Sequence, residues 1–151
     1  MYSFDGDSMS IIKKGSAIYH SLGKKAKANV STETGALNNQ PYGFNTRFED
    51  EPGTNPEELI AAAHASCFTM ALSFALEGEG YTDGQLKTEA AVSLDKDGDG
   101  FSVTKSALSL KAQVTGIDGD EFERIAQTAK AGCPISKLLN TEITLEYTLN
   151  Q

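Results

Sequence analysis

The sequence predicts an α+β protein in which one long helix separates two groups of strands. The first observation is an apolar helical stretch that runs unbroken from about residue 55 to residue 77. The second is an alternation of apolar and polar residues, typical of strands, on both sides of that stretch. The third is the order β, long α, β-meander, α, β, with no internal repeat and no low-complexity linker.

The segment before the long helix is expected to contain short strands and turns. Residues 16–20 and 28–32 have short β-like patterns, and residues 35–43 are rich in Gly, Asn, Gln and Pro, which is typical of a loop. Residues 44–49 are predicted as a strand that has its two phenylalanines on one face and Arg47 on the other.

The long helix has clear start and stop signals. Thr54 or Asn55 can cap it, and Pro56 suits the first helical position. Two glutamates follow, where the positive end of the helix dipole favours them, and Gly78 ends the helix. Because the stretch is apolar almost all round, we expect a central, buried helix. One face is expected to hold Ile60, His64, Cys67, Ala71 and Phe74.

Strand patterns return after the long helix. Residues 86–94 and 101–114 are predicted strands, and residues 142–149 form a last, alternating strand. The joining residues 95–100 match the first half of a calcium loop, but Ser106 stands where the bidentate glutamate is required. The loop also joins two strands, so a hairpin turn is favoured and no metal site is expected.

A second helix is predicted from Asp118 or Asp120 to about Ala131. Asp118 is followed three residues later by a glutamate, which is capping-box spacing. Gly132 suits a left-handed C-cap, and a short helical turn is expected from Pro134.

Composition excludes several classes of function. The formal charge of −8 argues against binding to nucleic acid or to an anionic membrane. We expect no membrane span from the apolar runs and no secretion signal from the acidic, polar start, so a cytoplasmic location with reduced thiols is expected. Residues 1–8 are expected to be a leader or disordered extension before a single domain over residues 9–151.

The two cysteines indicate thiol redox chemistry, because two thiols can pass between dithiol and disulfide states. Cys67 lies about three turns into its helix, too far from the N-terminus for the dipole alone to favour a thiolate. A reactive Cys67 therefore needs a cation, for which Arg47 is the best candidate, with Glu57 holding the guanidinium. The alternative is an inert, buried cysteine, which is the commoner case for a lone thiol.

Cys133 lies between glycine and proline near the start of a helical turn, where a thiolate is favoured, although a buried turn residue is an equal alternative. His64, one turn before Cys67, allows a Cys–His dyad, but a core or interface histidine is favoured. The chain has no Cys-x-x-Cys motif and no metal-ligand spacing, so zinc is not expected.

Five segments carry the motifs of a known family: residues 40–49, 53–59, 65–68, 92–95 and 129–134. In this order they resemble the OsmC/Ohr family of thiol-dependent organic hydroperoxide reductases, and the likeness spans about residues 9–149. The flanks of both cysteines are closer to the OsmC branch than to the Ohr branch.

The resemblance implies roles for four residues. Cys67 would be the peroxidatic nucleophile, and Cys133 would resolve its sulfenic acid into a disulfide. Arg47 would stabilise the thiolate, and Glu57 would pair with Arg47. The implied fold is an intertwined homodimer, with antiparallel-rich sheets around a long central helix and active sites at the subunit interface.

The resemblance further implies an organic hydroperoxide substrate, a dithiol reductant of the lipoyl type and a place in the oxidative or osmotic stress response. It implies no metal, haem or nucleotide cofactor. Two alternatives stay open. One is a non-catalytic, stress-induced binding protein on the same scaffold, and the other is a hydrolase with Cys67 as acyl nucleophile and His64 as its base.

Overall fold

The computed structural model describes residues 10–151, and its chain divides into two compact units. The first unit ends at Pro56, and the second comprises Glu57–Gln151. We describe each unit by itself. The leader predicted for residues 1–8 lies outside the described residues, and a single domain over residues 9–151 stays a prediction.

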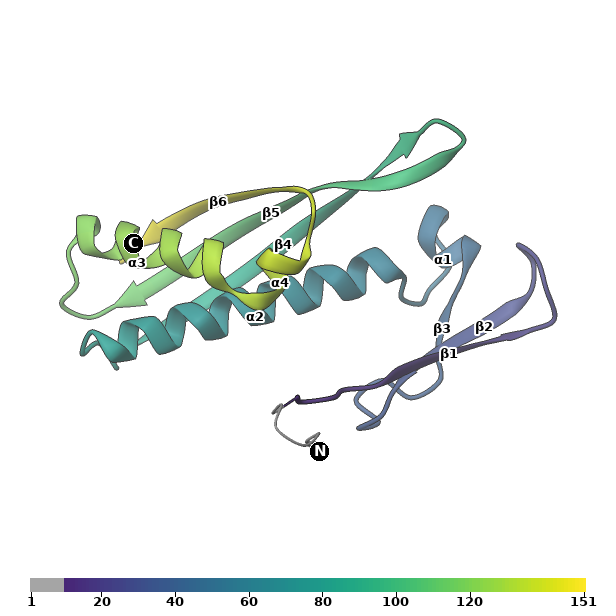
Figure 1. The fold of residues 1–151 in the computed structure, drawn as a ribbon, viewed down its shortest axis with the longest axis horizontal. Helices are drawn as coiled ribbons and strands as arrows, with labels where there is room; N and C mark the ends of the chain where they lie inside the picture. The colour runs from purple at the N-terminus through teal and green to yellow at the C-terminus, as the bar shows by residue number, and fades with distance from the viewer. Residues whose placement is uncertain (1–9) are drawn as a thin grey trace. The chain divides into compact units, whose positions relative to one another are not determined.

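The first unit is built on a three-stranded antiparallel sheet in the order β1-β2-β3 (Figure 1). The strands predicted near residues 16–20 and 28–32 are confirmed, whereas the loop predicted over residues 35–43 contains the third strand. The bounds are β1 Gly15–His20, β2 Lys27–Thr32 and β3 Gln40–Tyr42.

The strand predicted over residues 44–49 is wrong, because the chain forms the short helix α1, Phe44–Phe48, there. The two phenylalanines are four residues apart, a spacing that fits one face of a strand and one face of a helix equally. Their rings lie 5.1 Å apart. The hydroxyl of Thr46 accepts from the N–H of Gly43 at 2.8 Å and donates to its carbonyl at 3.1 Å, which closes the first turn.

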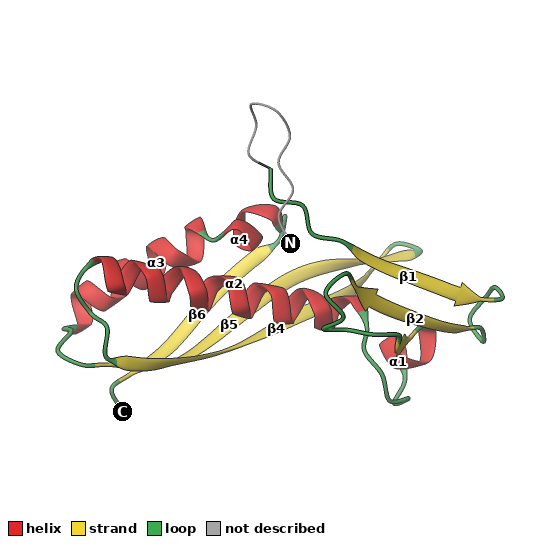
Figure 2. Cartoon of the chain, turned by 90° about the horizontal axis from the view of Figure 1, so that it is seen from below, coloured by secondary structure: helices red, strands yellow, loops and turns green. Residues whose placement is uncertain are grey.

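The second unit has helices α2 and α3 on one face of a second three-stranded sheet (Figures 1 and 2). β4 pairs antiparallel with β5, and β5 pairs parallel with β6, so α3 and α4 belong to the crossover between parallel strands. The bounds are α2 Pro56–Gly78, β4 Gly84–Asp97, β5 Gly100–Val114, α3 Gly119–Gly132, α4 Pro134–Leu138 and β6 Glu142–Leu149.

The hairpin turn predicted between β4 and β5 is confirmed, and it is shorter than expected. The strands continue until Asp97 pairs with Gly100. Two acidic residues of this segment accept hydrogen bonds across the hairpin, Asp97 from Ser102 at 2.6 Å and Asp95 from Thr104. The acidic residues therefore stabilise a turn between strands, as the hairpin interpretation requires.

The core of the second unit lies between its sheet and its two long helices. The alternation predicted for β5 is confirmed, because the even-numbered residues from Ser106 to Val114 are buried and those between Leu108 and Val114 are separated by exposed ones. The helices complete this core with Phe68, Leu72, Leu76, Phe122, Ile125, Ala126 and Ala129.

α2 is buried on one side only, which corrects our expectation of a helix buried all round. Phe68 and Leu72 are fully buried, whereas Met70 and Phe74 are 57% and 65% exposed. The shared face was also assigned wrongly, because steps of four from His64 define the buried side and Phe74 lies off it. α2 is long and apolar enough to cross a membrane by length and composition, contrary to our expectation, although a core helix of a soluble protein can pass the same test.

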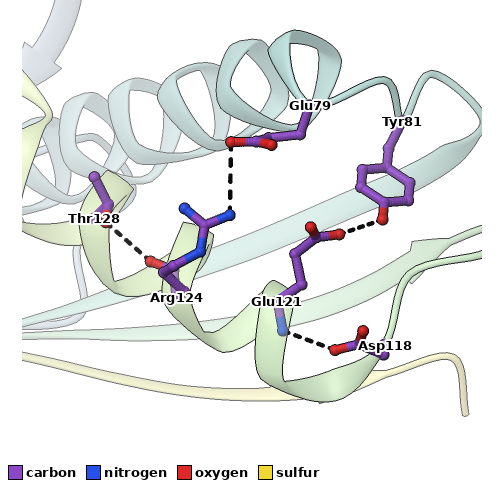
Figure 3. A network of polar contacts seen from close by, with 6 residues as sticks. All are labelled: Glu79, Tyr81, Asp118, Glu121, Arg124 and Thr128. Carbon is purple, nitrogen blue, oxygen red and sulfur yellow. Dashed lines mark hydrogen bonds and ion pairs between the residues drawn. The ribbon is translucent and has the colours of Figure 1, made fainter.

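A polar network joins the end of α2 to α3 (Figure 3). Asp118 accepts from the N–H of Glu121 at 2.9 Å, which confirms the predicted N-cap. The hydroxyl of Tyr81 donates to the Glu121 carboxylate, and this bond raises the pKa of Tyr81 because it stabilises the protonated phenol. Arg124 of α3 pairs with Glu79 at 3.5 Å.

Candidate active site

Cys67 lies half-buried in the middle of α2, next to the start of α4. Burial raises the pKa of the Cys67 thiol, and a hydrogen bond from the backbone N–H of Ile135 acts in the opposite direction. The neighbouring Cys133 sulfur raises this pKa further, through a hydrogen bond and through the like charge of its ionised form. Two cysteines far apart in the sequence are therefore neighbours within one chain, and both are free thiols.

Cys133 is the N-cap of α4 and is only 1% exposed. Its Sγ accepts from the N–H of Ser136 at 3.4 Å and lies 3.0 Å from the Ser136 hydroxyl. The left-handed cap predicted at Gly132 is wrong, because Cys133 itself ends α3 in an extended conformation, with φ of −67° and ψ of 141°. Pro134 explains this, since a proline restricts the residue before it to extended backbone.

His64 is a fully buried histidine, as favoured from the sequence. Its Nδ1 lies 2.6 Å from the hydroxyl of Ser106, and its Nε2 lies 2.8 Å from the hydroxyl of Ser136. Burial lowers the pKa of His64 and so favours the neutral ring. Because serine hydroxyls occupy both ring nitrogens, the geometry does not form a Cys67–His64 dyad.

Ser106 and Ser136 were not predicted as site residues. Ser106 stands in β5 in phase with the buried apolar residues, so it was a polar residue at a core position, which requires a partner. Ser136 follows Cys133 by three residues at a helix start, which is the spacing of an N-cap contact. Both signals were present in the sequence, but they become specific only when the partners are known.

Arg47 and Glu57 lie in different units. Arg47 is in the last turn of α1, with its guanidinium 5.2 Å from the centre of the Phe48 ring. Glu57 is in the first turn of α2, about 15 Å before Cys67 along the helix axis by the helical rise. The roles expected for these two residues toward Cys67 stay predictions.

A half-buried thiol beside a fully buried one, on an α+β scaffold, is an arrangement that permits dithiol redox chemistry. Residues 48–148 match the family described as OsmC-like protein, so the chain belongs to the OsmC-like family. This agrees with the resemblance drawn from the cysteine motifs, and most of the match falls in the unit that holds both thiols.

Relatives extend the match over most of the chain. Peroxiredoxin OsmC of Escherichia coli is 57% identical over 141 residues, which are 93% of this chain and 99% of that protein. The organic hydroperoxide resistance protein-like protein of Staphylococcus aureus is 33% identical over 102 residues, 67% of this chain and 72% of that one.

Solved structures confirm the α+β fold class. OhrB of Bacillus subtilis, described as an organic hydroperoxide resistance protein, has a TM-score of 0.67 and 26% identity, covering 91% of this chain and 98% of its own. The OsmC-like protein of Mycoplasma pneumoniae has a TM-score of 0.74 at 14% identity, covering 95% of this chain and 100% of its own. The second likeness concerns the fold alone.

Proposed function

We infer that this protein is a thiol peroxidase that reduces organic hydroperoxides to alcohols in the stress response. The observation that carries this inference is the placement of Cys67 and Cys133 as neighbours in one chain. The relatives named peroxiredoxin and organic hydroperoxide resistance protein-like support the same activity.

In the first step, the thiolate of Cys67 attacks the distal oxygen of R–O–O–H. The S–O bond forms as the O–O bond breaks, so the peroxide is reduced and the sulfur is oxidised to a sulfenic acid. The leaving alkoxide takes up a proton and departs as the alcohol. Partial exposure of Cys67 leaves a route for the substrate, whereas Cys133 is buried in the described chain.

In the second step, the sulfur of Cys133 attacks the sulfur of the Cys67 sulfenic acid. The S–S bond forms, the S–O bond breaks, and the proton of the Cys133 thiol leaves with the hydroxyl as water. A dithiol reductant then reopens the disulfide by thiol–disulfide exchange. The adjacency of the two sulfurs supports this assignment of roles, because resolution requires no second chain to supply a thiol.

Arg47 is proposed to favour the Cys67 thiolate and to stabilise the negative charge of the leaving alkoxide, with Glu57 orienting the guanidinium. A cation is needed because burial, the largest influence on this thiol, raises the pKa of Cys67. The Ile135 N–H acts in the favourable direction, and we expect Arg47 to add to it.

The remaining features of the proposal come from the family resemblance. We expect a homodimer in the cytoplasm, with a lipoyl-bearing dithiol as reductant and no requirement for a metal, haem or nucleotide. The two other functions considered above have less support. A hydrolase would need His64 as its base, but the ring nitrogens of His64 pair with two serines. A non-catalytic binding protein gives no reason for two neighbouring thiols.

Peroxide consumption with a dithiol reductant tests the function. We expect the wild type to reduce cumene hydroperoxide, Cys67→Ser to lose turnover by about a thousandfold or more, and Cys133→Ser to release one alcohol per chain and then stop. Cys133→Ser is also the matched control for Cys67→Ser, because each variant replaces one sulfur of the same pair. Equal turnover by the wild type and Cys67→Ser would contradict the peroxidase assignment.

A further inference from the structure

A continuous chain of buried polar groups runs from Cys133 into the core of the second unit. The Sγ of Cys133 lies 3.0 Å from the hydroxyl of Ser136, which lies 2.8 Å from Nε2 of His64, and Nδ1 of His64 lies 2.6 Å from the hydroxyl of Ser106. His64 and Ser106 are completely buried, and Ser136 is 8% exposed. Polar groups are costly to bury unless each one is paired. The presence of this network in the core therefore calls for a physical explanation.

We propose that Ser136 is a further catalytic residue of the second step and that His64 is its positioning residue. The Ser136 hydroxyl donates a hydrogen bond to the sulfur of Cys133 and stabilises the negative charge that develops there as the thiol gives up its proton before the attack. The neutral imidazole of His64 holds this hydroxyl in the donating orientation. The inference deepens the proposed function and depends on Cys133 being the resolving thiol.

The proposed role of Ser136 gives these hydrogen bonds a direction. The backbone N–H of Ser136 already donates to Sγ of Cys133, so this sulfur is placed as an acceptor. If the Ser136 hydroxyl also donates to it, the Ser136 oxygen accepts from Nε2–H of His64. Nδ1 then carries no proton and accepts from the hydroxyl of Ser106. In this arrangement every donor in the chain points toward the sulfur.

This direction requires a neutral His64 that is protonated on Nε2. The fully buried ring meets the first condition, and the low pKa caused by that burial agrees with it. Ser106, which is fixed in β5 opposite Ile143 of β6, is compatible with the second condition, because its hydroxyl can donate to Nδ1.

The chemistry balances without a proton entering this chain. Cys133 loses its thiol proton to the hydroxyl that leaves Cys67, and water departs as the S–S bond replaces the S–O bond. The hydrogen bond from Ser136 favours this step because it stabilises the Cys133 sulfur as the thiol proton leaves, and the charge is then consumed as the S–S bond forms. Peroxide cleavage by Cys67 precedes this and does not involve Ser136.

Single-turnover kinetics of two serine variants test the proposal. Ser136→Ala and Ser106→Ala each remove one hydroxyl partner of the same imidazole, so a purely structural role predicts similar effects. We expect Ser136→Ala to slow disulfide formation about tenfold to a hundredfold, the loss of one hydrogen bond to a charged group, with a smaller effect for Ser106→Ala. Alcohol release reports the first step, and loss of the second thiol reports disulfide formation.

Two substitutions of His64 supply a second readout. The side-chain amide of glutamine reaches the place of Nε2 and can still donate to Ser136, whereas that of asparagine reaches the place of Nδ1 and can pair only with Ser106. We expect disulfide formation in His64→Gln to exceed that in His64→Asn by about tenfold, at similar thermal stability. Thermal unfolding of all variants identifies any that fail to fold.

The outcomes distinguish a failure of the role given to Ser136 and His64 from a failure of the proposed function. Disulfide formation at the wild-type rate in Ser136→Ala, or equal rates in His64→Gln and His64→Asn, would overturn the role of the Ser136–His64 pair. Absence of alcohol release from the wild type would instead overturn the proposed function, whatever the serine variants do.

Discussion

At the scale of single residues, Cys67 is subject to opposing influences. Burial disfavours its thiolate, and the Cys133 thiol adds to that effect, whereas the Ile135 N–H favours the thiolate. A peroxidase needs the thiolate at neutral pH, because the thiol is a poor nucleophile. A positive charge near Cys67 would resolve this conflict, which is the role expected of Arg47.

Replacing Arg47 with alanine is expected to raise the pKa of Cys67. Loss of a nearby cation disfavours the thiolate, so the midpoint of alkylation should move to higher pH by about one unit or more, and the rate at pH 7 should fall. The measurement is the rate of Cys67 alkylation against pH, with the labelled cysteine located by mass spectrometry.

Arg124→Ala is the control for this experiment. Arg124 is the other arginine of the sequence, and it pairs with Glu79 at the end of α2, away from the thiols. Its loss should leave the alkylation profile in place. An Arg47→Ala profile that coincides with the wild type would refute the role of Arg47.

At the scale of elements, the register of β4 on β5 depends on the absence of a side chain at Gly84. Gly84 begins β4 and pairs with Val114, and a Cβ at Gly84 would lie 2.0 Å from the backbone carbonyl oxygen of Gln113. That oxygen cannot rotate away, because it belongs to the backbone of β5. A side chain at this position forces the two strands apart.

Gly84→Ala is therefore expected to lower the free energy of unfolding by about 2 kcal/mol or more. Gly119→Ala is the matched control, because a Cβ at this first residue of α3 meets no atom within 4 Å. Alanine is also the better helix former, so Gly119→Ala should leave stability unchanged or raise it by up to about 1 kcal/mol. Denaturant unfolding measures both, and equal stabilities of the two variants would contradict the steric argument.

The elements that could be predicted are those whose pattern has one interpretation. The alternation along β5 fits only a strand with one buried face, and α2 has both a cap signal and a glycine end. The strand prediction for residues 44–49 was wrong because phenylalanines four residues apart fit a strand and a helix alike. The left-handed cap predicted at Gly132 was wrong because the proline two residues later already ends α3.

Some residues of the candidate site could likewise be singled out from the sequence, and others could not. Both cysteines were identified because their motifs are distinctive, and His64 was assigned to the core because buried histidines are common there. Its serine partners were missed, since Ser106 and Ser136 are 42 and 72 positions away from His64 and reach it only through the fold. Long-range contacts of this kind leave no local periodicity.

At the scale of the whole molecule, the apolar side of α2 that this chain leaves uncovered is relevant to assembly. Met70 and Phe74 are more than half exposed on a helix whose other side forms the core. Exposed apolar residues on one helix are a feature of protein interfaces. They are consistent with the homodimer expected from the family resemblance.

We expect the wild type to sediment as a dimer and Phe74→Glu to shift it toward the monomer, because a buried, unpaired carboxylate is costly at an apolar interface. Leu22→Glu is the control, since Leu22 is 89% exposed in the turn between β1 and β2. Sedimentation velocity at several concentrations measures the assembly. A monomeric wild type, or a Phe74→Glu protein that remains as dimeric as the wild type, would count against this interface.

The parallel pairing of β5 with β6 has a consequence for synthesis on the ribosome. β4 and β5 emerge first and can close as a hairpin, but the other edge of β5 stays unpaired until the whole crossover and β6 have followed. Cys133 lies within that crossover. A nascent chain therefore exposes Cys67 before its partner thiol has been docked, and an oxidant that reached it then would form a sulfenic acid that the chain itself could not yet resolve.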